Sequence, residues 1–180
     1  MALWFLLIAS YAGYKEYNLR TGQTVMLRVV PVDPRDMFRG DYVILNYDIS
    51  RMPEDRRSEE SSPYYGDTVY VSLVKDGDYY KAGQIFKSYP PKGLFIKGEV
   101  RENSFGISTI VYGIESYFVP EGEGHNLENA IRQHNVAAEV AINHYGHAVI
   151  KNLIIDGQKV TFKHKKEQES QQKENNEENY

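Results

Sequence analysis

Short strand-forming runs, each closed by a turn signal, set the tightest limit on what this chain can fold into. The clearest pair occupies residues 68–75 and 79–87, and Asp76-Gly77-Asp78 separates them, as in a β-hairpin. Asn126 is a candidate N-cap for a short helix over residues 127–133. Other strand-like runs, bounded by Pro, Gly, Asn or Asp, lie at residues 24–32, 42–49, 94–101, 105–114, 136–142, 148–155 and 159–162. The pattern predicts a mainly β chain: a single sandwich or open-barrel-like domain of antiparallel hairpins with one short helix.

The composition suits a sheet and excludes several kinds of site. The chain has 15 tyrosines and 7 phenylalanines against 1 tryptophan, and aromatic side chains pack well on strands. It has no cysteine, which excludes disulfides, thiolate zinc sites and a cysteine nucleophile. A net charge of -4 argues against nucleic acid as a partner, because non-specific binding requires a basic surface.

A hydrophobic segment precedes the predicted domain. Residues 2–13 read ALWFLLIASYAG and carry no charge, but the run is shorter than the ~20 residues of a spanning helix. Trp4 and the tyrosines at 11, 14 and 17 are typical of a membrane interface. Three interpretations stay open: a membrane anchor whose basic start is missing, a signal peptide with a poor cleavage site, and a buried first element of a soluble protein. We favour the membrane-related interpretation.

The expected organisation therefore has three parts. Residues 1–17 form a hydrophobic anchor or signal-like segment, and residues 18–162 form the β-rich domain. Residues 163–180 are almost wholly polar, a composition that predicts disorder.

The most specific pattern is the run GDYVILNY at residues 40–47. Gly40 and Asp41 suit a turn at the mouth of a strand. Because side chains alternate along a strand, the odd-numbered residues from Val43 to Ile49 share an apolar face, and the even-numbered ones share a mixed face. A turn followed by a core strand explains the run without a binding role.

Charged residues beside this turn are the better candidates for a docking surface. They are Asp33, Arg35, Asp36 and Arg39. Four charges of both signs can make a polar network, and the ordinary alternative is a set of surface ion pairs worth at most ~1 kcal/mol each.

Three blocks in order make the chain resemble the GDYXXLXY protein family over its whole length except the tail. They are PVDPRD at residues 31–36, GDYVILNY at 40–47 and YFVPEG at 117–122. The resemblance implies a bacterial, membrane-anchored protein with its domain on the extracytoplasmic side, often encoded beside or fused to multi-pass membrane proteins. It implies no activity, cofactor or catalytic residue. The residues we select as motif or binding residues are Asp33, Arg35, Asp36, Arg39, Gly40, Asp41, Tyr42, Leu45, Tyr47, Tyr117, Phe118, Pro120 and Glu121.

A weaker likeness links the opening of the chain to type I signal peptidases. Those proteases also have an anchor, a strand, a proline-containing turn and a Gly-Asp-x-Val strand, and they place a nucleophilic serine in that turn. Here Asp33-Pro34-Arg35-Asp36 stands in the turn, and no lysine base can be assigned. The departure argues against proteolysis, and architecture alone does not supply function.

We favour a non-catalytic interaction module for a multi-pass membrane or envelope partner. One alternative is an envelope hydrolase that uses Asp36, Asp41 and Glu121. Another is a small-ligand-binding domain with a pocket lined by Tyr79, Tyr80 or Tyr112. His144 and His147 form an H-x-x-H pair, but zinc takes three or four ligands, so we expect a solvated turn there and no metal or cofactor.

Overall fold

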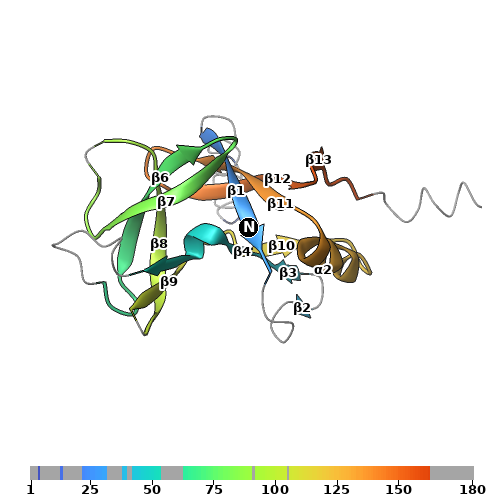
Figure 1. The fold of residues 1–180 in the computed structure, drawn as a ribbon, viewed down its shortest axis with the longest axis horizontal. Helices are drawn as coiled ribbons and strands as arrows, with labels where there is room; N and C mark the ends of the chain where they lie inside the picture. The colour runs from blue at the N-terminus through green and yellow to red at the C-terminus, as the bar shows by residue number, and fades with distance from the viewer. Residues whose placement is uncertain are drawn as a thin grey trace, which may run out of the picture.

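The computed structural model describes residues 4, 13, 22–31, 38–39, 42–53, 63–90, 92–104 and 106–162. Strands dominate these ranges and pair antiparallel in three sheets (Figure 1). The mainly β prediction is therefore confirmed.

The first sheet has the order β13-β12-β11-β1-β4. Its strands are β1 (Gln23–Val30), β4 (Asn46–Tyr47), β11 (Val136–Ile142), β12 (Ala148–Ile155) and β13 (Gln158–Lys159). The second sheet, β10-β3-β2, is small and consists of β2 (Phe38–Arg39), β3 (Tyr42–Ile44) and β10 (Ser116–Phe118).

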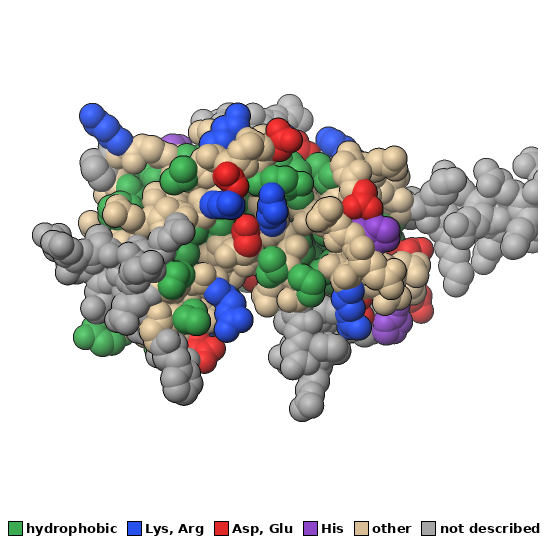
Figure 2. All heavy atoms as spheres, in the orientation of Figure 1, with side chains coloured by type: hydrophobic (Ala, Val, Ile, Leu, Met, Phe, Trp, Pro, Cys, Tyr) green, Lys and Arg blue, Asp and Glu red, His purple; other side chains and the backbone are tan. Residues whose placement is uncertain are grey.

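The third sheet, β5-β9-β8-β6-β7, is strongly curved and barrel-like (Figure 1). It contains β5 (Arg51–Pro53), β6 (Thr68–Asp76), β7 (Tyr79–Phe86), β8 (Phe95–Ser104) and β9 (Ile107–Val111). A short 3-10 helix, η1 (Asp48–Ser50), precedes β5, and the α-helix α2 (Gly124–Gln133) connects β10 to β11. In Figure 1 the small sheet and α2 lie on one side of β1, and the curved sheet lies on the other. Charged side chains of both signs are interspersed on the same face (Figure 2).

One hydrophobic core joins the three sheets. Along β1, Val25, Leu27 and Val29 are buried while the residues between them face outward, which is the alternation that a half-buried strand requires. The central strand β11 is buried on both faces except at Glu139. The largest fully buried side chains include Leu27, Leu45, Tyr47, Ile49, Ile110 and Leu153, so the motif strand contributes directly to the core.

Two local predictions are wrong. The helix begins at Gly124, and Asn126 lies inside it, where its side-chain amide donates to the Glu123 carboxylate at 3.0 Å. Glu123 occupies the N-cap position without a side-chain cap, so Asn126 is not the cap. The last strand was predicted over residues 159–162, but β13 spans Gln158–Lys159.

Two predicted segments fall mainly or wholly outside the description. Of residues 1–17 the structure describes Trp4 and Gly13 alone, and it describes none of residues 163–180. Among the described residues, no helix has both the length and the apolar character needed to cross a membrane.

Candidate functional site

The motif segment passes through all three sheets in twelve residues. β3 pairs with β10, β4 pairs with the end of β1, and β5 pairs with β9. Leu45 lies between β3 and β4, and its N–H donates to the Glu115 carbonyl at 2.7 Å. The single strand predicted over residues 42–49 is thus wrong: it breaks at Leu45 and ends at η1, because the chain changes hydrogen-bonding partners there.

The predicted alternation nevertheless survives this break. Val43, Leu45, Tyr47 and Ile49 are all buried, whereas Tyr42 is exposed. The apolar face therefore belongs to the core, as expected.

Two tyrosine hydroxyls tie this segment to the strands beside it. Tyr47 donates to the Ile114 carbonyl at 2.6 Å, and Tyr112 donates to the Ile49 carbonyl at 2.5 Å, both in the interior. Burial raises the pKa of both phenols far above their ordinary value, and the charge of Glu115 adds to the effect. Both stay neutral donors, and both have structural roles.

The three tyrosines that we considered as candidates for lining a ligand pocket have different surroundings. Tyr112 is a core residue, so that part is wrong. Tyr80 is partly buried against the core. Tyr79 lines an open groove of about 700 Å³, and the Arg28 guanidinium lies over its ring at 4.4 Å.

The runs at residues 40–47 and 117–122 meet in the small sheet. In the β3–β10 pair, Phe118 stands opposite Tyr42, and Tyr117 stands opposite Val43. The rings of Tyr42 and Phe118 pack edge to face, with centroids 5.8 Å apart and an interplanar angle of 74°. They are 49% and 63% exposed. We call this exposed pair the aromatic edge.

The rest of the second block is divided between the domain and solvent. Tyr117 is half-buried, and its ring centroid lies 6.5 Å from that of Phe162. Pro120 is half-buried, and Glu121 is exposed in the turn before α2.

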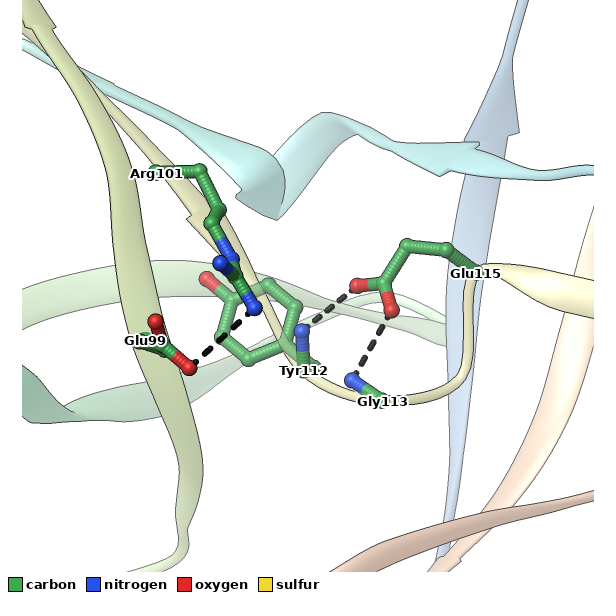
Figure 3. A network of polar contacts seen from close by, with 5 residues as sticks. All are labelled: Glu99, Arg101, Tyr112, Gly113 and Glu115. Carbon is green, nitrogen blue, oxygen red and sulfur yellow. Dashed lines mark hydrogen bonds and ion pairs between the residues drawn. The ribbon is translucent and has the colours of Figure 1, made fainter. Parts of the chain in front are cut away.

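Glu115 holds the connection between β9 and β10. Its carboxylate accepts the N–H groups of Tyr112, at 2.5 Å, and Gly113, at 2.8 Å. Gly113 has a φ of 78°, a conformation that glycine adopts without strain. Figure 3 shows the Glu115 side chain folding back onto this turn, while Arg101 pairs with Glu99 on β8 at 3.3 Å.

The role of Glu115 escaped the sequence analysis. Its backbone carbonyl also accepts from Leu45, so one residue fixes both the turn and the neighbouring motif strand. The only signal in the sequence is the strand–Gly-x-Glu order at residues 113–115, which many surface turns share.

The structure does not describe most of the charged candidate residues. Asp33, Arg35, Asp36, Gly40 and Asp41 lie outside the described residues, and of Arg39 the structure gives only its place on β2, opposite Tyr42. Those predictions remain predictions, as does the hydrolase hypothesis that uses two of these carboxylates.

The histidine pair lies in a structured turn between β11 and β12. The Asn143 side chain accepts the N–H groups of Tyr145, at 2.9 Å, and His147, at 3.0 Å. Across the described ranges, no group of three His, Cys, Asp or Glu side chains is placed to hold a metal ion.

Comparison with known proteins gives one match. A family model described as GDYXXLXY protein matches residues 4–153, a range that includes β1 to β11, α2 and most of β12. No curated protein and no solved structure matches the chain.

Proposed function

Because the chain belongs to the GDYXXLXY protein family, we propose that its β domain is a non-catalytic interaction module that uses the aromatic edge to bind an extracytoplasmic segment of a multi-pass membrane protein. The hydrophobic run at residues 2–13 holds the domain at the membrane where that partner resides.

The observation that carries the proposal is the convergence of the two blocks. Tyr42 and Phe118 are 76 positions apart in the chain, and the pairing of β3 with β10 brings them side by side. The other motif side chains, Leu45 and Tyr47, are needed by the core, but the aromatic edge contributes little to it. Exposed aromatic side chains that already pack against each other are typical anchors of protein interfaces.

The position of the aromatic edge favours an extended segment of the partner. β10 stands at the end of its sheet, and among the described strands only β3 pairs with it. An extended peptide can add to such an edge through main-chain hydrogen bonds, while side-chain pockets or rings supply specificity. Phe118, on β10 itself, would contact alternate side chains of that peptide.

Anchoring in the same membrane supports the interaction energetically. Tethering raises the effective concentration of the domain near its partner, so a small interface suffices. We place the β domain on the extracytoplasmic side, as the family resemblance implies.

Site-specific photocrosslinking in native cells tests the proposal. A photoreactive phenylalanine analogue at position 118 should give a discrete adduct with a membrane protein, and Tyr42→Ala combined with Phe118→Ala should abolish co-purification of that protein. Tyr145→Ala is the matched control, because Tyr145 is 55% exposed in the β11–β12 turn and lies outside the small sheet. Absence of an adduct from position 118, or equal loss of the partner in the control, would contradict the proposal.

A further inference from the structure

A small groove opens where the motif segment leaves β4 and enters β5. It has a volume of about 290 Å³, and the described residues of its polar lining are Asn46, Ser50, Arg51, Glu102 and Thr109. Val30 and Tyr47 contribute an apolar wall. The groove includes the last two residues of the motif, Asn46 and Tyr47, but not the aromatic edge.

Ser50 is the unusual member of this lining. Ser50 is 5% exposed, and its hydroxyl has no hydrogen-bond partner among the residues that the structure describes. An unpaired buried hydroxyl lowers stability, and departures from local consistency of this kind concentrate at functional sites. The hydroxyl oxygen has almost no accessible surface, so a ligand in the groove reaches it only when a neighbouring side chain shifts; the ligand then supplies the acceptor that the described part of the chain does not provide.

The strand register places three further polar side chains in a row. Arg51 on β5 stands opposite Thr109 on β9, and Thr109 stands opposite Glu102 on β8. Directly opposed residues of antiparallel strands have their side chains on the same face. Arg51 forms no ion pair with any residue that the structure describes, and it is exposed at the rim.

From this arrangement we infer that the groove binds the carboxylate of a small monoanionic molecule. Arg51 supplies a charge-assisted donor, which guanidinium groups form well with carboxylates. The hydroxyls of Ser50 and Thr109 and the amide of Asn46 supply neutral donors, and Val30 with Pro31 accommodates a short apolar remainder.

This site is separate from the proposed docking surface. Ser50 lies on η1, Arg51 on β5 and Thr109 on β9, whereas the aromatic edge lies on β3 and β10. Failure of one proposal therefore leaves the other standing.

Amide NMR of the full-length chain in non-ionic detergent tests the inference, with sodium acetate as the probe at constant ionic strength. We expect saturable shifts that centre on the amides of residues 46, 50, 51 and 109. Arg51→Gln should weaken the affinity for acetate at least about tenfold, because a charge-assisted hydrogen bond is lost. Shifts that grow linearly without saturation, or that are unchanged in Arg51→Gln, would overturn the inference.

Two variants separate binding from folding. Arg101→Gln is the matched control, since Arg101 pairs with Glu99 and is not part of the lining; it should leave the acetate affinity within about twofold of the wild type. Ser50→Ala should weaken acetate binding and yet melt at the same or a higher temperature, because it removes an unpaired buried hydroxyl. A lower melting temperature for Ser50→Ala would show that the hydroxyl is paired within the protein, which contradicts the role assigned to it.

Discussion

Tyr42 and Tyr47 are five positions apart in one motif, yet their side chains have different environments. Tyr47 is 1% exposed, and its hydroxyl donates to the Ile114 carbonyl. Tyr42 is 49% exposed, and its ring packs against that of Phe118, which is 63% exposed. The motif thus contains one tyrosine that stabilises the core and one that is exposed on the surface.

This difference predicts that replacing tyrosine by phenylalanine lowers the stability at one position and leaves it almost unchanged at the other. Tyr47→Phe leaves the Ile114 carbonyl without its donor in the interior, and the free energy of unfolding should fall by about 1–2 kcal/mol. Tyr42→Phe should change it by less than about 0.5 kcal/mol, as is usual for surface positions. Chemical denaturation of the two variants measures both values, and an equal loss at both positions would refute the assignment of Tyr47 to the core network.

The end of α2 is fastened to the β12–β13 turn through Asp156. Its carboxylate accepts the Asn135 N–H at 3.1 Å and contacts the His134 ring nitrogen Nδ1 at 2.6 Å. The hydrogen bond from the Asn135 N–H, followed by the His134 side chain, holds the pKa of Asp156 below its ordinary value. This residue therefore links a helix end to a hairpin turn.

The lowered pKa gives this link a pH dependence of known sign. A carboxylate with a lower pKa in the folded state contributes its full stabilisation above the unfolded-state pKa of about 3.9, and loses it as the pH falls through the folded-state pKa. The difference in unfolding free energy between wild type and Asp156→Asn should thus be largest above about pH 5 and shrink below about pH 4. Asparagine is the appropriate replacement because Asp156 has a φ of 48°, which asparagine tolerates. A difference that grows on acidification would show that the carboxylate is not stabilised in the fold.

At the scale of single strands, the alternation of apolar and polar residues was the most reliable predictor of which side chains are buried. It placed Val43, Leu45, Tyr47 and Ile49 in the core correctly, because burial of one face depends only on local periodicity. It could not show that the segment changes sheets at Leu45, because that break depends on a hydrogen bond to Glu115, seventy residues away. The pairing of Phe118 with Tyr42 could not be predicted either, because the sequence of neither strand indicates which distant strand it pairs with or in which register.

At the scale of the molecule, the start of β1 and the small sheet lie at opposite ends of one strand. β1 runs from Gln23 to Val30, and β4, which follows β3 in the motif segment, pairs at its Val29–Val30 end. Eight residues of strand span about 25 Å, so the aromatic edge lies well away from the point where the chain enters the domain. If the preceding residues insert in a bilayer, the aromatic edge can contact parts of a partner that project from the membrane surface.

The anchor itself gives the last prediction. We expect the full chain in its native cell to sediment with membranes and to be cleaved when protease is added to intact spheroplasts. A variant that lacks residues 1–17 should keep its fold, because the core begins at Val25 on β1, but it should move to the soluble fraction. Tyr fluorescence and thermal melting of the truncated domain provide the control that it has folded. Protection of the full chain in the soluble fraction would contradict the membrane anchor. The exposed pair of Tyr42 and Phe118 does not depend on where the domain resides. The partner of the aromatic edge would then have to be sought among soluble proteins.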